Sequence, residues 1–522
     1  MTTFDNEKAT EQASIANNDA SYRLDAHYAP HPDYEGAHRY DTSATWTVKE
    51  EASLVRRIDF RITVWACVLI CAMQLDRGNI SQANSDNFLG DINITTNEFN
   101  YGQSIYIGCF VLAELPSQLI SRRVGPDRWV PMLVMGWSLV AMCQSLVHDK
   151  ISFYITRSFM GLLEGGFVPI AVLYLSYWYK TSELPTRLSF FWVGNYATNI
   201  VSSFLALGIL KLRGHRGWPG WKYLFLIEGT LTFCVGVFTW FYLPASPTQT
   251  RNRFRKNGWF TEKEEIILVT RVLRDDPSKG DMSHQKMISP RELLRSLYDY
   301  DIWPLYILNL MQYIPMTPQY TYLTLNLRAL GFSTFETNLL TMPVYVMIIV
   351  QLLLTTRIAK WIKGQRTFIS MSAQFWSLPF LITMITLPDS TNHWVKYGIT
   401  VGLLSYPYPQ AIFAAWTSEN SNSVRTRAVS IAINNIMVNL GSIAGSNIYR
   451  KDDAPNYRRG NLVCLVILSI NIVLFLVTKI YFILRNQYHR RRWNAMTVQE
   501  QDAYLAANKH LGNKRFDFQF AH

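Results

Sequence analysis

Long apolar segments alternate with short polar ones along most of the chain. An α-helix needs about 20 mostly apolar residues to cross the hydrocarbon core of a membrane, and twelve segments have about that length. They form two sets of six, near residues 60–82, 100–121, 129–147, 151–179, 188–210 and 222–243, and near 302–325, 335–357, 367–387, 393–416, 427–448 and 461–484. The pattern predicts an all-α membrane protein with twelve transmembrane helices in two six-helix bundles.

The polar segments set the expected domain organisation. Residues 1–45 are polar and lack an apolar core, which argues against a cleavable signal peptide and predicts disorder. Residues 46–60 have the pattern of a helix at the membrane surface. We therefore expect a cytoplasmic disordered tail and interfacial helix over 1–57, an N-terminal bundle over 58–243, a cytoplasmic connector over 244–300, a C-terminal bundle over 301–485 and a cytoplasmic tail over 486–522.

Composition agrees with a membrane protein and excludes several soluble classes. The 522 residues are 49% hydrophobic and only 17% charged, which is too apolar for an ordinary soluble enzyme. The net charge of +12 comes from short basic clusters between apolar segments, so we expect contact with lipid headgroups and no nucleic-acid partner. All six cysteines lie within apolar segments without metal-ligand spacing, so neither a disulfide framework nor a metal site is expected.

The basic residues also predict the orientation of the chain in the membrane. Loops on the N-terminal side carry most of the lysines and arginines, and the positive-inside rule then places both termini in the cytoplasm. The loops at 211–222 and 450–459 are basic on the opposite side and weaken this count without reversing it. Asn93-Ile94-Thr95 is a glycosylation sequon in the first expected outer loop. We expect a multi-pass protein of the plasma membrane.

Ionisable residues interrupt two of the apolar segments in the first half. Asp76, Arg77 and Asn79 end the first one, and Arg157 and Glu164 stand seven residues apart, on nearly the same helix face, in the fourth. Charges inside a membrane are costly and mark solute or proton paths, so we expect these groups to face a cavity. An arginine can hold an anion and a carboxylate can carry a proton. A static ion-pair network that holds helices together is the alternative.

Further polar residues lie in other predicted spans. Glu114 precedes Pro116 and fits either a gating role or plain packing, whereas Glu228 is expected to pair with an arginine. Pro407 and Pro409 predict a broken helix. The second half carries amides and aromatic rings that fit either helix packing or a neutral half of a binding site, namely Gln312, Tyr313, Gln319, Tyr320, Tyr406, Tyr408, Gln410, Asn434, Asn435 and Asn439.

Several motifs occur in a fixed order over about residues 46–490. They are Asp76-Arg77-x-Asn79-Ile80, the segment Ala113 to Ser121, Arg157 seven residues before Glu164-Gly165-Gly166, the segment Gly220 to Gly229 and the segment Gly258 to Glu265. With this set the chain resembles the anion:cation symporter branch of the major facilitator superfamily and, within it, the fungal allantoate permease group. That group includes carriers of nicotinate, pantothenate, allantoate, cysteine and sulfonates.

The resemblance implies the major facilitator fold and roles for individual residues. Arg77 would hold the anion, acids at Asp76 and Glu164 would couple protons, and Arg157 would modulate Glu164. The loop from Arg122 to Trp129 keeps the Asp-Arg pair of the superfamily but loses part of its glycine frame. We expect substrate binding by Arg77, Asn79, Tyr313, Gln319, Tyr406 and Asn435, proton coupling by Asp76, Glu164 and Arg157, and gating by Glu114, Asp127 and Arg128.

These features predict a proton-coupled symporter that moves a small organic or sulfur-containing anion into the cytoplasm by alternating access. The expected partners are the anion, protons and the lipid bilayer, with no cofactor, no metal and a monomeric state. A nutrient-sensing receptor with the transporter fold and an uncoupled anion facilitator remain as alternatives. An enzyme is disfavoured because the spans contain no nucleophile–base set, metal cluster or phosphate loop.

Overall fold

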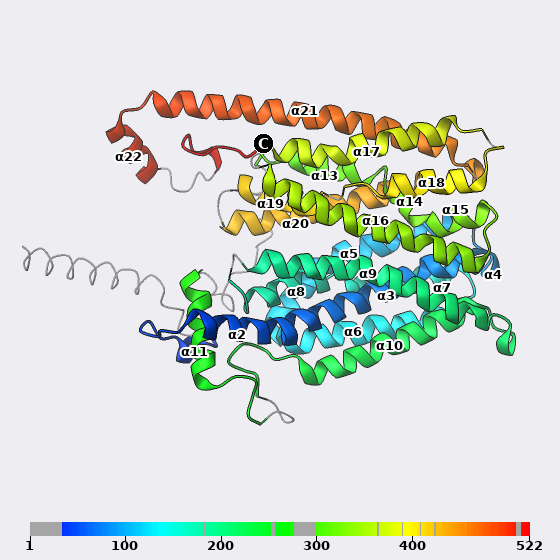
Figure 1. Cartoon of the computed structure of the whole chain (residues 1–522), viewed down its shortest axis with the longest axis horizontal. Helices are drawn as coiled ribbons and strands as arrows, with labels where there is room; N and C mark the ends of the chain where they lie inside the picture. Colours follow the sequence, from blue (N-terminus) through cyan, green and yellow to red (C-terminus); the bar gives the residue numbers. More distant parts are fainter. Residues whose placement is uncertain are drawn as a thin grey trace, which may run out of the picture.

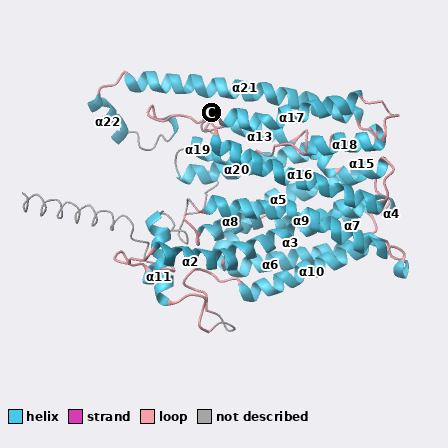
Figure 2. Cartoon of the chain, viewed as in Figure 1, coloured by secondary structure: helices cyan, strands magenta, loops and turns pink. Residues whose placement is uncertain are grey.

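The computed structural model describes residues 34–522, except 181–182, 252–255, 276–298, 363–364, 389, 408, 422–423, 455 and 508–512. The described residues form helices and loops without a strand (Figure 2). Two layers of roughly parallel helices lie against each other, one from each half of the chain (Figure 1). The expected all-α class and the two-bundle architecture are confirmed.

The first half contains one helix, or one pair of helices, for each predicted span. Helix α2 (Val48–Ile58) continues through a π-helical turn (Asp59–Thr63) into α3 (Val64–Ser85), so the surface helix and the first span are continuous. The rest of this half comprises α4 (Phe88–Asp91), α5 (Thr96–Val124), α6 (Pro126–Cys143), α7 (Lys150–Glu164), α8 (Phe167–Ser176), α9 (Leu184–Ile209) and α10 (Gly220–Tyr242).

The second half has more interruptions. It comprises α13 (Trp303–Tyr313), α14 (Thr317–Thr321), α15 (Leu323–Ala329), α16 (Thr334–Trp361), α17 (Arg366–Thr386), α18 (His393–Leu404), α19 (Gln410–Asn420), α20 (Val424–Ser446), α21 (Arg458–Asn494) and α22 (Val498–Ala507). Helix α21 passes the expected boundary at 485 by nine residues.

Nine helical segments in the described part of the chain are long and apolar enough to cross a membrane. The predicted spans outside that set are 302–325, 393–416 and 427–448. The first is divided into α13, α14 and α15, and the second breaks between Leu404 and Gln410 around Pro407 and Pro409. Proline lacks an N–H and its ring clashes with the preceding turn, so the broken helix predicted at these prolines is confirmed. Tyr408 lies outside the described residues.

Apolar side chains cover the outside of both bundles. Leu112, Phe204 and Phe238 in the first half and Leu353 and Val473 in the second are each more than half exposed. In water such a surface would be a liability, but hydrocarbon solvates it well. The exposed apolar surface agrees with a protein embedded in a bilayer.

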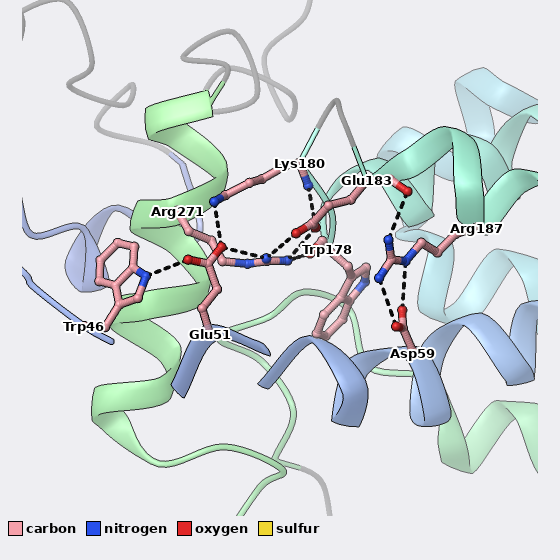
Figure 3. A network of polar contacts seen from close by, with 8 residues as sticks. All are labelled: Trp46, Glu51, Asp59, Trp178, Lys180, Glu183, Arg187 and Arg271. Atoms are coloured by element: carbon pink, nitrogen blue, oxygen red, sulfur yellow. Dashed lines mark hydrogen bonds and ion pairs between the residues drawn. The ribbon is translucent and has the colours of Figure 1, made fainter. Parts of the chain in front are cut away.

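The connector docks onto one end of the first bundle through α11 (Glu262–Asp275). Arg271 of α11 is fully buried and reaches Glu183 at 3.0 Å, Glu51 at 3.4 Å and the carbonyl oxygen of Trp178 at 2.8 Å (Figure 3). Lys180 also binds Glu51, at 2.6 Å. A buried guanidinium needs its charge compensated by acidic or carbonyl groups, so these partners hold α11 against α2 and the loop before α9.

Candidate functional site

A cavity of about 380 Å³ lies between the two layers of helices. Both halves of the chain line it, which is the arrangement expected for a solute path between two bundles. Its polar and charged lining includes Arg77 and Ser81 on α3, Gln103 and Tyr106 on α5, Arg157 on α7, Tyr196 and Asn199 on α9, Tyr313 on α13, Tyr320 on α14, Tyr345 on α16, Tyr406, Gln410 on α19, and Asn435 and Asn439 on α20.

The charge on the cavity wall is positive. Arg77 and Arg157 are the charged residues among the described residues that line it. The remaining lining side chains are aromatic, aliphatic, amide or hydroxyl groups. Two guanidinium groups in a wall of low polarity attract an anion more strongly than they would in water, because little solvent screens them.

Tyr106 connects both arginines to the buried carboxylate of Glu164. The guanidinium carbon of Arg157 lies 4.3 Å from the centre of the Tyr106 ring, and that of Arg77 lies 5.3 Å from it. The hydroxyl of Tyr106 donates a hydrogen bond to Glu164, which is fully buried. Arg157 also donates to Gln103 at 2.8 Å. A charged site therefore extends from the cavity surface through one aromatic ring to a carboxylate behind it.

Glycines in α7 make this contact possible. A Cβ atom at Gly161 would lie 2.3 Å from the carbonyl oxygen of Tyr106, and one at Gly165 would lie 2.1 Å from that of Phe110. Only glycine allows two helix backbones to approach so closely. The Gly-x-x-Glu-Gly sequence of α7 therefore brings Glu164 within reach of the Tyr106 hydroxyl.

Asp76 does not line the cavity, contrary to our expectation. Neighbouring residues on a helix point about 100° apart, so Asp76 faces away from the side of α3 that carries Arg77. It is fully buried against α6 and α10, where Ser138 donates to it at 3.4 Å. Asn79 is also fully buried outside the cavity lining.

Glu228 lies near Asp76 rather than beside an arginine. Its side chain is fully buried on α10, and neither carboxylate oxygen has a hydrogen-bond partner among the described residues. The charged neighbour that acts on it is the carboxylate of Asp76. The prediction that Glu228 pairs with an arginine is therefore wrong for the described part of the structure.

The second half contributes three of its four expected binding residues to the cavity. Tyr313, Tyr406 and Asn435 line it, and the hydroxyl of Tyr313 donates to Gln410 at 3.1 Å. Gln319 does not line it. Its amide is buried and donates to Asn461 at 2.6 Å and to the hydroxyl of Tyr449. Gln319 therefore belongs to the packing of α14 against α21.

Glu114 joins the two halves at the cavity. Both of its oxygens lie 3.0 Å from the amide nitrogen of Asn435, which donates to them from α20. Glu114 itself is buried on α5 and is only 6% exposed. A gating candidate of the first half thus holds a cavity-lining residue of the second half.

Asp127 and Arg128 lie away from the cavity, in the first turn of α6. Gly125 precedes them with φ of 95°, a conformation that favours glycine and allows the sharp turn between α5 and α6. Arg128 is exposed. The expected gating role of this pair therefore depends on contacts beyond the cavity.

Further hydrogen bonds between the halves lie near the start of α5. There Asn100 donates to the carbonyl oxygen of Tyr449 at 2.8 Å and accepts from the hydroxyl of Tyr322. Asn338 donates to Ser85 at 2.9 Å. Glu114 lies 14 residues beyond Asn100 along α5, roughly 21 Å away. The Glu114–Asn435 contact is thus far from the hydrogen bonds of Asn100.

Sequence analysis missed several cavity residues of the first half. Gln103, Tyr106 and Phe110 recur at spacings of three and four on α5, and Tyr196 and Asn199 do so on α9. The same spacing argument that joined Arg157 to Glu164 would have placed each set on one helix face. Aromatic residues are common in membrane helices, so this signal was weaker than a charge.

Comparison with known proteins supports this architecture. The sequence model of the Major Facilitator Superfamily matches residues 66–446. The chain is 42% identical over 491 residues to the "Uncharacterized transporter YIL166C" of Saccharomyces cerevisiae, a match that covers 94% of this chain and 90% of the yeast protein. It is 26% identical over 428 residues to the "MFS-type transporter efuF" of Hormonema carpetanum, covering 81% and 84% of the two chains.

Solved structures share the fold at low sequence identity. A bacterial homologue of the human lysosomal transporter Spinster, in an inward-facing and unoccupied conformation, aligns with a TM-score of 0.62 at 13% identity and covers 83% of this chain and 98% of its own. A D-xylose–proton symporter aligns with a TM-score of 0.57 at 15% identity, covering 80% and 97%. Both likenesses concern the arrangement of the helices.

Proposed function

The chain belongs to the Major Facilitator Superfamily and is a membrane transporter rather than an enzyme, and we propose that it is a proton-coupled symporter for a small organic or sulfur-containing anion. Candidate substrates are vitamin carboxylates, ureides and sulfonates. In this proposal the plasma membrane holds the protein with both termini in the cytoplasm. The anion and protons enter the cell together by alternating access.

The observation that carries the anion assignment is the pair of arginines on the cavity wall. Arg77 and Arg157 both line the cavity, and Asp76 and Glu164 do not. A guanidinium offers parallel N–H donors that match a carboxylate or a sulfonate. A cationic solute would be repelled by two guanidinium groups in a region of low polarity, whereas an anion is attracted to them.

The second half would recognise the rest of the substrate. Tyr313, Tyr406 and Asn435 supply hydroxyl, aromatic and amide groups on the wall opposite the arginines. Such groups distinguish molecules by shape and by hydrogen bonding, because an unmatched buried polar group costs about 1–3 kcal/mol. We therefore assign charge recognition to the first half and selectivity among anions to the second.

Glu164 is the proposed proton site. It is buried behind Tyr106 and accepts that residue's hydroxyl hydrogen, and it interacts electrostatically with Arg77 and Arg157. When Glu164 is protonated, its pull on the two arginines weakens and they can turn their charge to the anion. When the proton leaves, the carboxylate competes with the anion for the arginines and favours its release.

Transport by purified protein in liposomes tests this proposal. We would measure uptake of radiolabelled nicotinate, pantothenate, allantoate and taurine with and without an imposed inward proton gradient, and with an uncoupler. Nicotinamide, the uncharged analogue of nicotinate, is the matched control. We expect the gradient to concentrate at least one anion and not nicotinamide.

Two results would contradict the proposal in different ways. Anion uptake that equilibrates without responding to the gradient would favour the uncoupled facilitator. Anion binding without any uptake would favour the nutrient-sensing receptor.

A further inference from the structure

Residues 513–522 fold back against the second bundle, between α19 and α21 (Figure 1, red segment beside the label C). At its start, Asn513 donates to Asp299 at 2.7 Å and to the carbonyl oxygen of Asn420 at 3.3 Å. From residue 518 onward the segment has no helix or turn. It follows α22 and belongs to the region 486–522 that the sequence predicts to be a cytoplasmic tail.

Two asparagines, one on α19 and one on α21, bind the backbone of Phe520 and Ala521. Asn486 on α21 donates to the carbonyl oxygen of Phe520 at 2.9 Å and accepts from its N–H at 2.7 Å. Asn420 on α19 accepts from the N–H of Ala521 at 2.8 Å and donates to its carbonyl oxygen at 3.2 Å. The N–H and C=O groups of Phe520 thus bind one side-chain amide, and those of Ala521 bind the other. Each amide pairs with the backbone in the way that a neighbouring β-strand would.

A buried aromatic side chain anchors the same residues. Phe520 is only 3% exposed, and its ring stacks on that of Phe482 with centres 5.3 Å apart. The indole N–H of Trp416 on α19 donates to the carbonyl oxygen of Ala521 at 2.7 Å. The ring nitrogen Nδ1 of His489 on α21 lies 3.0 Å from the carbonyl oxygen of Phe518. The segment is therefore held by hydrogen bonds to its backbone and by the packing of Phe520 in a buried apolar cluster.

The helix that the segment holds is part of the cavity wall. Helix α19 begins at Gln410, directly after the break at 405–409, and Gln410 lines the cavity and accepts from Tyr313. A short helix that follows a break with two prolines has few backbone hydrogen bonds to its predecessor, so its tilt depends on side contacts. Trp416 and Asn420 supply such contacts at its other end.

We propose that residues 513–522 are a built-in peptide ligand of the side chains that α19 and α21 present to them, and that their docking restrains α19 and with it one wall of the cavity. By linkage, a contact made in one conformation stabilises that conformation, so release of the segment gives α19 more freedom to move. This proposal is independent of the substrate and of proton coupling.

Hydrogen–deuterium exchange on the full-length protein in lipid nanodiscs tests the proposal. The variants are Phe520→Ser, which removes the ring that packs on Phe482, and a chain that lacks residues 513–522. Gln519→Ala is the matched control, because Gln519 is exposed in the same segment. Helix α10 serves as an internal reference in the other bundle.

We expect both the deletion and Phe520→Ser to speed exchange in residues 410–420 by about tenfold or more, while Gln519→Ala and α10 stay unchanged. Equal exchange rates in residues 410–420 of Phe520→Ser and Gln519→Ala would overturn the proposal. So would faster exchange throughout the protein, because that result indicates general destabilisation rather than release of α19.

Discussion

The guanidinium of Arg157 lies over the ring of Tyr106, with its carbon 4.3 Å from the ring centre. No ion pair within 4 Å joins Arg157 to Glu164 among the described residues, because the tyrosine stands between them and donates its hydroxyl to the carboxylate. The described residues therefore lack a direct Arg157–Glu164 ion pair, which a static ion-pair network between these helices could have used. The cation–π contact keeps Arg157 on the cavity wall, where Glu164 acts on it through space and not through a direct ion pair.

Tyr106→Phe separates the two contacts of this ring. The variant keeps the surface on which Arg157 lies and removes the donor to Glu164. Loss of a hydrogen bond to a charged group costs about 1.5–3 kcal/mol, so we expect gradient-driven uptake to fall by about tenfold or more. Substrate affinity should change by less than about threefold. Tyr106→Ala, which also removes the ring under Arg157, should lower substrate affinity more than Tyr106→Phe does. Equal losses of affinity in the two variants would show that the hydroxyl group serves substrate binding.

Arg77→Lys tests the anion clamp while preserving charge. A lysine ammonium is a point charge and cannot reproduce the planar fork of a guanidinium. We expect the dissociation constant of the transported anion to rise by about tenfold or more, measured by calorimetry on purified protein. An unchanged dissociation constant would mean that Arg77 does not contact the anion through its fork.

Glu164→Gln mimics the protonated form of the proposed coupling residue. The variant should retain substrate binding and counterflow exchange but lose accumulation driven by a pH gradient. Proteoliposome assays of concentrative uptake and of counterflow measure the two activities separately. Asp76→Asn, run in parallel, should affect accumulation less, because Asp76 faces α6 rather than the cavity. The opposite ranking would move the proton site to Asp76.

The second half offers a matched pair for testing selectivity. Tyr406 lines the cavity and Gln319 does not, although both were expected to bind substrate. Tyr406→Ala should change the relative uptake of competing anions by about fivefold or more, since each unmatched polar contact is worth about 1 kcal/mol. Gln319→Ala should lower thermal stability and leave the ranking of anions unchanged. A changed ranking in Gln319→Ala would contradict this division.

Arg271→Ala tests the docking of the connector. Removing the buried arginine leaves Glu183 without its ion-pair partner and Glu51 with Lys180 alone, at a cost of about 3 kcal/mol. We expect hydrogen exchange in α11 to accelerate by about a hundredfold, which corresponds to that cost. Lys263→Ala is the control, because the Lys263–Glu50 pair is exposed and exposed pairs contribute little. Equal effects of the two variants would assign no special role to the burial of Arg271.

Hydropathy was sufficient to predict the all-α class and the division into two bundles, but not the division of the predicted span 302–325 into α13, α14 and α15. Twenty apolar residues in a row can satisfy their backbone in a membrane only as a helix, whatever their neighbours. Proline chemistry was likewise local, so the break between Leu404 and Gln410 followed from Pro407 and Pro409. Charge inside a membrane is rare enough that Arg77, Arg157 and Glu164 stood out without any structure.

The direction in which each side chain points depended on packing between helices. Asp76 and Arg77 are adjacent in the chain, yet one faces α6 and the other lines the cavity. The link between Tyr106 and Glu164 requires α5 and α7 to touch at Gly161 and Gly165, and no pattern within either helix encodes that contact. Glu114 and Asn435 are 321 residues apart in sequence. Helical periodicity places residues on one face of one helix, whereas only the tertiary structure decides which faces meet.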